Sequence, residues 1–180
     1  MADELFVVFS REPKLSMIEA ISPFGVKVLT VPRNQSAVRS IADAFKSSKS
    51  EYCLLATERV PFLKPNVALA LFECASGNDS AIPKWADGKV EPMLAVYRKN
   101  AFTRLVTSLK QPFGSNVSKE IASVAEQLFD VKFVSVEGDL MELDPELDSF
   151  FQVKDEKSLL AAREKASIKG KRIQLKKLAK

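Results

Sequence analysis

The sequence contains no histidine, and this absence limits the chemistry that the protein can perform. It excludes Ser-His-Asp and Cys-His nucleophilic sites and every histidine-ligated metal. The two cysteines, Cys53 and Cys74, are too few to hold zinc without histidine, and their apolar neighbours predict buried, reduced thiols. Any catalysis must therefore rest on carboxylates, Lys, Arg, Tyr or a cation held by carboxylates, such as magnesium.

Glycine and long apolar runs are also scarce. Only six glycines occur, and no two have the spacing of a Walker or dinucleotide-binding loop. Because glycines let backbone N–H groups approach phosphates closely, we expect no intact phosphate-binding loop. No window approaches the roughly 18 apolar residues of a membrane helix, and the Met-Ala-Asp-Glu start is acidic where a signal peptide is basic. We therefore expect a cytoplasmic protein without membrane contact.

Apolar strand-like segments alternate with helix-like segments over the first 75 residues. Continuous apolar runs predict strands at 5–9, 26–31 and 52–57, the first of them fully buried. Helical spacing of apolar residues predicts helices at 35–48 and 65–74. This alternation favours an α/β fold of three layers with a mostly parallel, Rossmann-like sheet. We expect one domain over 1–168, followed by a basic tail at 169–180.

The middle of the chain departs from this alternation. Segments 81–85 and 93–97 flank Asp87-Gly88, a strong turn signal that predicts a small antiparallel β-ribbon or an antiparallel excursion of the chain. Helices are expected near 100–109, 118–129 and 155–167, and one more strand at 131–136. Gly170 marks the start of linker-like composition before the basic end.

In open parallel sheets, ligands bind at the carboxyl ends of the strands. The loop after 5–9 contains Arg11 and Lys14, which either hold an anion by charge or belong to a solvated loop. The loop after 52–57 contains Glu58, followed by Pro61-Phe62. A carboxylate there can ligate magnesium in phosphoryl transfer. A structural salt bridge to the adjacent Arg59 is an equal alternative.

The segment from Glu91 to Arg98 is more distinctive. A Pro-Phe-Leu turn and a helix precede it, then an Asp-Gly turn, and it reads Glu-Pro-Met-Leu-Ala-Val-Tyr-Arg. This order resembles the MobA-like molybdenum cofactor guanylyltransferases, which have a fold of the nucleotide-diphospho-sugar transferase type. The resemblance covers nearly the whole chain and is specific between Tyr52 and Arg98.

The resemblance implies a function and a set of residues. Family members use magnesium to join a nucleoside monophosphate, taken from a triphosphate, to a phosphorylated acceptor such as molybdopterin. The family's third strand ends in Asp-x-Pro-Phe, so Glu58 would be the catalytic metal ligand. Its substrate-side strand corresponds to Glu91, Tyr97 and Arg98. The segment at 151–155 resembles the family's late Asn-Val-Asn-Thr-Pro and places Gln152 at the ligand.

Several departures from the family pattern bear on activity. By this resemblance the chain starts at the family's second strand, without a counterpart to the Gly-rich opening loop. The glycines of the family's Gly-Pro-Leu-x-Gly segment are absent from 34–38. The family's Asp is replaced by Glu58 with one extra residue, or by Arg59. Lys154 stands where a late Asn is expected and is a poor neighbour for magnesium.

Basic residues concentrate at the carboxyl terminus. Segment 154–180 contains ten Lys or Arg and three Asp or Glu, whereas the rest of the chain has a small acidic excess. Either this tail is a frayed, solvated segment, or it contacts an acidic partner or nucleic acid by phosphate neutralisation. It lacks aromatic stacking residues, which makes single-strand base recognition unfavourable and leaves nucleic acid a weak candidate.

Three functional hypotheses follow. The first is a degenerate relative of the guanylyltransferases that binds a nucleotide, a molybdopterin-type ligand or an intact paralogue without full catalysis. The second is an active, magnesium-dependent nucleotidyltransferase that uses Glu58. The third is an interaction module that uses the basic tail. A strand edge left bare beside the missing first strand further predicts a homodimer or a paralogue partner.

Overall fold

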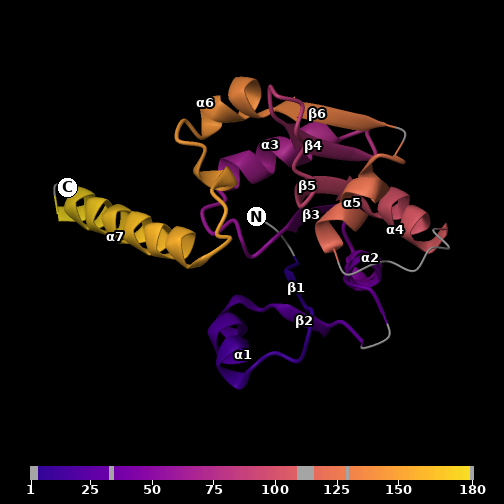
Figure 1. Cartoon of the computed structure of the whole chain (residues 1–180), viewed down its shortest axis with the longest axis horizontal. Helices are drawn as coiled ribbons and strands as arrows, with labels where there is room; N and C mark the ends of the chain where they lie inside the picture. Colours follow the sequence, from indigo (N-terminus) through magenta and orange to yellow (C-terminus); the bar gives the residue numbers. More distant parts are fainter. Residues whose placement is uncertain (1–3, 33–34, 109–115, 129, 179–180) are drawn as a thin grey trace.

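The computed structural model describes residues 4–32, 35–108, 116–128 and 130–178, with side chains described as far as residue 168. Its strands form two sheets (Figure 1). The smaller sheet pairs β1 (Phe6–Phe9) with β2 (Lys27–Thr30) in parallel. The larger sheet has the order β3-β5-β4-β6. Its strands are β3 (Tyr52–Ala56), β5 (Leu94–Arg98), β4 (Ser80–Lys84) and β6 (Val131–Ser135).

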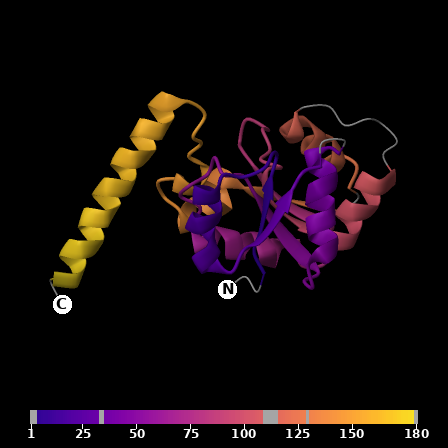
Figure 2. The ribbon, with the colours of Figure 1, turned by 90° about the horizontal axis from the view of Figure 1, so that it is seen from below.

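Helices connect these strands and cover the larger sheet. In chain order, the helices are α1 (Leu15–Ile21), α2 (Ala37–Ser47), α3 (Pro65–Ala75), α4 (Lys99–Ser108), α5 (Val117–Ala125), α6 (Met141–Leu143) and α7 (Glu156–Leu178). Short helical turns lie at Ser22–Phe24, Val136–Leu140 and Asp148–Phe150. Figure 2 shows α7 extending away from the body of the molecule. No helix among the described residues is both long and apolar enough to cross a membrane.

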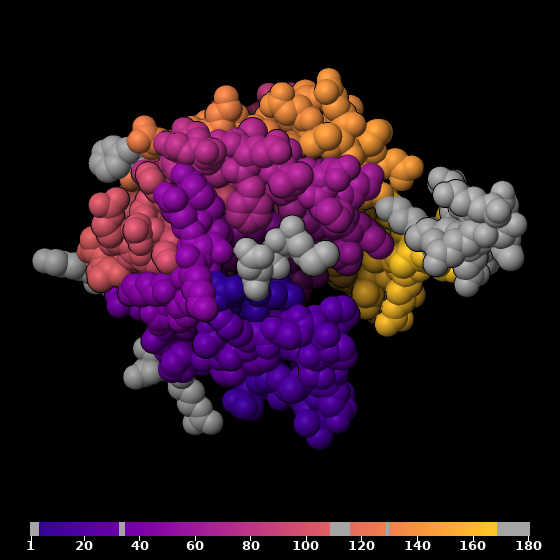
Figure 3. All heavy atoms as spheres, turned by 180° about the vertical axis from the view of Figure 1, so that it is seen from behind, coloured from indigo at the N-terminus to yellow at the C-terminus, as the bar shows by residue number. Residues whose placement is uncertain are grey.

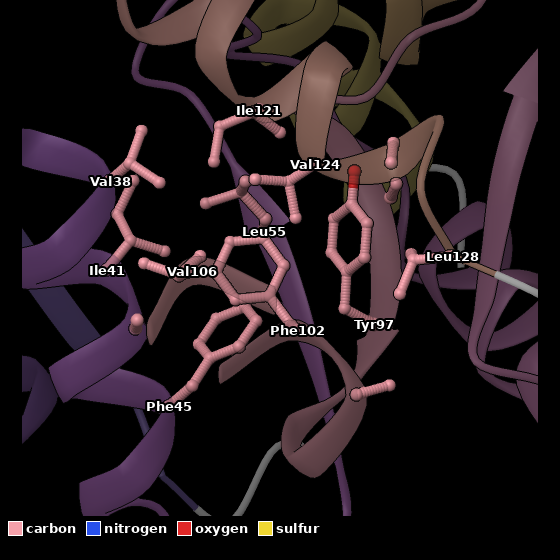
Figure 4. Close-up of a cluster of buried hydrophobic side chains, with 14 of the residues drawn as sticks. Val38, Ile41, Phe45, Leu55, Tyr97, Phe102, Val106, Ile121, Val124 and Leu128 are labelled. Atoms are coloured by element: carbon pink, nitrogen blue, oxygen red, sulfur yellow. The ribbon is translucent and has the colours of Figure 1, made fainter. Parts of the chain in front are cut away.

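The larger sheet lies between two hydrophobic cores, which confirms the three-layer α/β architecture. Side chains alternate along a strand, so Ala95 and Tyr97 of β5 face one core while Leu94 and Val96 face the other. Helices α2, α4 and α5 form the first core with them (Figure 4), and α3 forms the second. Figure 4 shows Phe102 next to Phe45 and Tyr97, with ring centroids 4.9 Å and 5.1 Å away.

The antiparallel excursion that the sequence predicted is confirmed, because β4 and β5 pair in antiparallel register on either side of the Asp87-Gly88 turn. β5 lies between β3 and β4 and is antiparallel to both, whereas β4 and β6 are parallel. The Asp87-Gly88 turn is present, with Gly88 at φ 90°. After this turn the chain enters β5 in the middle of the sheet. This central position suits β5 because the strand is almost wholly apolar and both of its faces need cover.

Two expectations are corrected. Strand β1 is only half-buried along its whole length, because among the described strands it pairs with β2 alone. The last helix does not end before Gly170 but continues to Leu178. The residues around Gly170 are mostly strong helix formers, and one interior glycine costs only about 1 kcal/mol. The expected helix ends at Leu109 and Phe129 lie outside the described residues.

Glu4 connects the two sheets through its side chain. Its carboxylate accepts hydrogen bonds from Lys27 Nζ (2.6 Å), the Lys49 amide (2.6 Å) and Ser48 Oγ (2.9 Å). The hydrogen bond from Lys27, followed by those from Lys49 and Ser48, lowers the pKa of Glu4 from 4.5 to about 2. Protonation of Glu4 therefore releases the contact between the start of β1 and the segment before β3.

We expect the Glu4 carboxylate to titrate with a midpoint near pH 2 in side-chain ¹³C NMR. Since the folded pKa is lowered, the contribution of Glu4 to stability is complete above pH 4.5 and is lost as the pH falls towards 2. Removing the largest contributor by Lys27→Ala should raise the midpoint towards 4.5. A midpoint near 4.5 in the unchanged protein would contradict the hydrogen-bonded geometry.

Candidate functional site

The carboxyl ends of β3 and β4 place a compact polar group at one edge of the larger sheet. The loop after β4 folds back on itself, since the Glu91 amide donates to the Pro83 carbonyl at 3.0 Å. The Ala56–Leu94 pairing brings the loop after β3 alongside. The Val153 amide donates to the Arg59 carbonyl at 2.8 Å. This hydrogen bond holds segment 151–155, which we call the late segment, against the loop after β3. We call Arg59, Trp85, Lys89, Glu91 and Gln152 the carboxyl-edge cluster.

Glu91 organises the carboxyl-edge cluster. Its Oε1 accepts hydrogen bonds from Trp85 Nε1 (3.0 Å) and Lys89 Nζ (2.5 Å), and its Oε2 accepts one from Gln152 Nε2 (3.3 Å). Only 9% of Glu91 is exposed, so its charge is balanced by Lys89 rather than by water. The Lys89 ammonium also lies 5.7 Å from the Trp85 ring centroid. Glu91 thus fixes three donors from two distant chain segments.

Arg59 and Lys89 leave positive charge accessible at this edge. Their side chains are 60% and 57% exposed. Their exposed cationic ends are accessible to an anion, and hydrogen bonds from Arg or Lys to a phosphate are about twice as strong as neutral ones. The arrangement can therefore bind an anionic group while Trp85 offers an aromatic edge beside it.

Glu58 contacts the carboxyl-edge cluster only through its neighbour Arg59. Its side chain is 87% exposed, and it accepts a hydrogen bond from Thr57 Oγ1 at 3.0 Å and lies 4.0 Å from Arg59 Nε. Among the described residues, no group of three or more Cys, Asp or Glu side chains could hold a metal. A magnesium ion bound by one carboxylate and by phosphate oxygens needs no such group. Glu58 therefore fits only this form of site, with Arg59 as an unfavourable neighbour.

The structure separates two of the residues that the Glu91–Arg98 motif suggested as ligand contacts. Tyr97 is 0% exposed and donates its hydroxyl hydrogen to the Pro92 carbonyl at 2.7 Å. Burial raises the pKa of Tyr97, so the phenol stays neutral. Tyr97 is thus part of the first core, because the alternation of β5 points it inward.

Arg98 lies at the opposite end of the sheet from Glu91. Its guanidinium pairs with Glu51 at 2.7 Å, which raises the pKa of Arg98. Arg98 and Glu51 line a hollow of about 420 Å³ with Asn100, Ala101, Thr103 and Arg104. A five-residue strand separates its two ends by roughly 15 Å, so Arg98 does not reach the ligand edge that Glu91 occupies.

Arg11 and Lys14 follow β1 and belong to the smaller sheet. Both are largely solvent-accessible, and neither makes a hydrogen bond or ion pair among those found for the described side chains. Lys14 precedes α1 and accepts two backbone hydrogen bonds of its first turn through its carbonyl. The structure does not bring these two cations into the carboxyl-edge cluster.

A buried ionic network supports the late segment, and no motif in the sequence announced it. Asp144 and Asp148 are buried and pair with Lys64 at 2.5 Å and 3.9 Å, and Lys165 pairs with Asp148. Burial by itself would raise the pKa of Asp144, but hydrogen bonds from Lys64 and Ser149 outweigh it and lower this pKa. Lys64, directly before α3, and Lys165 of α7 thus hold the turn that leads to Gln152.

Apolar contacts complete this support. Phe62 and Phe151 pack with ring centroids 5.8 Å apart, and the Lys165 ammonium lies 6.0 Å and 5.6 Å from these rings. Leu147, with φ 48°, turns the backbone between the two buried aspartates. A run of acidic residues with apolar neighbours at 142–148 is the one signal in the sequence that could have pointed to burial here.

Comparison with known proteins agrees with this architecture. Two archaeal proteins described as probable molybdenum cofactor guanylyltransferases are similar to the chain. The protein from Methanosarcina mazei is 36% identical over 106 residues, and that from Methanosarcina acetivorans 30% over 107 residues. Each match covers 59% of this chain but 45% of the relative. The chain thus matches less than half the length of these curated relatives.

Solved structures are similar over most of the chain. The molybdopterin-guanine dinucleotide biosynthesis protein A of Archaeoglobus fulgidus matches with a TM-score of 0.64 and 25% identity, over 90% of this chain and 78% of that one. The 4-diphosphocytidyl-2C-methyl-D-erythritol synthase of Anaerococcus prevotii matches with a TM-score of 0.63. At 14% identity over 92% of this chain and 79% of that one, it supports the fold alone.

The family model described as the MobA-like NTP transferase domain matches residues 1–128. That range includes both sheets except β6 and ends before the segment that contains Gln152. Because the match covers well over half of the sequence and the fold agrees with it, the chain belongs to the MobA-like NTP transferase family.

Proposed function

We propose that this protein binds a phosphorylated ligand at the carboxyl-edge cluster and does not by itself complete nucleotidyl transfer. The observation that carries this proposal is the contrast between two carboxylates. Glu91 is buried and holds three donors in place, whereas Glu58 is exposed beside Arg59 and joins no metal-binding group of three or more acidic or thiol side chains among the described residues. The side chains that would bind the ligand are thus held in place by hydrogen bonds to Glu91, whereas the Glu58 carboxylate, which would bind a metal, is not held in this way.

The ligand class follows from the relatives and from the charge of the edge. The similar proteins are named for molybdenum cofactor and molybdopterin-guanine dinucleotide biosynthesis. A molybdopterin-type ligand combines a phosphate with a flat heterocycle. Lys89 and Arg59 suit the phosphate, and Trp85 offers an apolar edge for the ring.

Magnesium enters only in the competing proposal. An active guanylyltransferase would place Mg²⁺ between Glu58 and the phosphate oxygens, where the ion supplies charge neutralisation. The names of the relatives favour this alternative. The Arg59 charge next to Glu58 opposes it, because it competes with the cation for the same carboxylate.

Calorimetric titration with a phosphorylated pterin and with GTP, each with and without Mg²⁺, tests the proposal. We expect binding of the phosphorylated pterin at micromolar concentration and no release of pyrophosphate from GTP in the presence of the pterin. Glu58→Gln removes the carboxylate that a metal would need and frees Arg59 from its 4.0 Å ion pair, so pterin binding should be retained or slightly strengthened.

Magnesium-dependent pyrophosphate release that Glu58→Gln abolishes would establish the active enzyme instead. Absence of pterin binding, in protein whose circular dichroism and melting are normal, would refute the binding proposal itself. The Arg98→Ala variant is the matched control, because it removes a cation at the other end of the same sheet.

A further inference from the structure

A polar hollow lies at the end of the larger sheet that the carboxyl-edge cluster does not occupy. Its volume is about 420 Å³, within the range of small-molecule sites. Two of its lining residues, Ala101 and Thr103 of α4, are buried and form its inner surface. The others are polar or charged and more exposed: Glu51, Arg98, Asn100 and Arg104. We call this space the α4 hollow.

Arg104 is anchored at one side of its guanidinium and free at the other. Its Nε donates to the Asn100 carbonyl at 3.3 Å, which holds the guanidinium against α4. Among the hydrogen bonds and ion pairs found for the described side chains, none uses its two terminal nitrogens. The edge that these nitrogens form can donate to two oxygens of a phosphate at once. Arg104 therefore presents a phosphate-binding fork whose direction is already restrained.

Arg98 supplies a second guanidinium, which is only partly used. Its Nε and Nη2 lie 2.9 Å and 2.7 Å from Glu51 Oε1, and its Cζ lies 6.0 Å from the Tyr52 ring centroid. Both contacts with Glu51 use one edge of the guanidinium, so the Nη1 side stays available to a second acceptor. The lining of the α4 hollow thus carries two positive charges against one negative charge. This balance favours an anionic ligand.

A neighbouring hollow of about 330 Å³ continues along α4 towards α2. It shares Thr103 and Arg104 with the α4 hollow and adds Lys46, Thr107 and Ser108. Figure 3 shows the coral atoms of α4 beside the purple atoms of α2 on one flank of the molecule. The hydroxyls of Thr107 and Ser108 donate to helix carbonyls, at 2.7 Å and 2.9 Å. Since their hydrogens are engaged, these oxygens can only accept hydrogen bonds from a ligand.

We propose that the α4 hollow binds a phosphorylated sugar, with the phosphate on Arg98 and Arg104. The sugar hydroxyls then donate to the Thr107 and Ser108 oxygens in the neighbouring hollow. A phosphate has three terminal oxygens and can accept from both guanidiniums at once. The two connected hollows also offer more room than a phosphate alone requires, which leaves space for the sugar.

A nucleic-acid strand is the poorer occupant. Glu51 borders the α4 hollow, and Asp43 lies 3.8 Å from Lys46 at the neighbouring one. Both carboxylates are more than half exposed, so they repel the successive phosphates of a long polyanion, whereas a single phosphate can bind on the guanidinium side alone. Sugar-phosphate binding here is independent of the proposed function, because the α4 hollow and the carboxyl-edge cluster lie at opposite ends of the sheet.

Ribose 5-phosphate titrated into ¹⁵N-labelled protein tests the α4 hollow by NMR. The Ala101 amide reports on this hollow, and the Trp85 indole N–H reports on the carboxyl-edge cluster. We expect the Ala101 signal to shift to saturation with a Kd below about 1 mM. Inorganic phosphate should shift the same signal with an affinity roughly fivefold lower, because it lacks the sugar hydroxyls.

Two changes in the lining should act in opposite directions. Arg104→Ala removes the free fork and should weaken ribose 5-phosphate binding about tenfold or more. Glu51→Gln removes the negative charge of the lining and should strengthen this binding about threefold. Lys89→Ala is the matched control, because it removes one positive charge at the other end of the sheet, and it should leave the Ala101 titration unchanged.

Thr107→Val should lower the affinity for ribose 5-phosphate towards that for inorganic phosphate. Equal affinities of Arg104→Ala and the unchanged protein, or of the two phosphates, would overturn the proposal. A shift of the Trp85 signal without one at Ala101 would also overturn it, while the proposed function would remain. Binding of polyuridylate without binding of ribose 5-phosphate would identify a nucleic-acid surface instead.

Discussion

Replacement of Asp144 by alanine is expected to lower the free energy of unfolding by about 3–5 kcal/mol, as for other broken buried ion pairs. Asp144 is 0% exposed, pairs with Lys64, and accepts the Ser149 amide at 2.7 Å. Its loss leaves Lys64 half-buried without its closest partner. Urea denaturation followed by circular dichroism measures the change.

Glu51→Ala is the matched control for this variant. This variant also breaks an ion pair between an acidic and a basic side chain, because Glu51 pairs with Arg98 at 2.7 Å. Both of these side chains, however, are exposed to solvent. Exposed pairs contribute about 0–1 kcal/mol. If both variants lose the same stability, the network around Asp144 does not hold the late segment in place.

The stability of the Asp144→Ala variant should depend on pH less than that of the unchanged protein. Because the pKa of Asp144 is lowered in the folded protein, its contribution is present above its ordinary value of 3.8 and is lost as the pH falls below that value. The loss of stability on acidification should therefore be smaller in Asp144→Ala than in the unchanged protein.

Lys89→Ala is expected to weaken binding of a phosphorylated pterin by about thirtyfold, or about 2 kcal/mol, the range of one hydrogen bond to a charged group. Lys89 is held over the edge by Glu91 and Trp85, so little ordering is needed when an anion binds. The binding enthalpy and affinity from calorimetry measure this loss. Added salt should weaken binding to the unchanged protein more than binding to the variant.

Arg98→Ala should leave the same affinity unchanged. It removes one positive charge, as Lys89→Ala does, but at the amino end of β3. A loss with Arg98→Ala as large as that with Lys89→Ala would move the ligand to the hollow lined by Arg98 and Arg104. If neither Lys89→Ala nor Arg98→Ala changes the affinity, the ligand binds at neither end of the sheet.

Local sequence patterns predicted most elements because each pattern reflects one element's own burial. The apolar run at 52–57 became β3, and the helical spacing after Asn34 became α2 with Ser36 as its N-cap. The scarcity of glycine and the absence of histidine likewise needed no structure to limit the chemistry. The motif from Glu91 to Arg98 identified the family without identifying which of its side chains are accessible.

Only the tertiary structure decided which of these residues meet. Glu91 and Gln152 are 61 residues apart yet share a hydrogen bond, and this proximity depends on how the late segment crosses the sheet. Tyr97 and Arg98 are neighbours in sequence but lie in the core and at the far end, because a strand alternates its faces and carries its ends apart. The order of the strands in the two sheets also belongs to the fold alone, since strand order is set by pairing between distant segments.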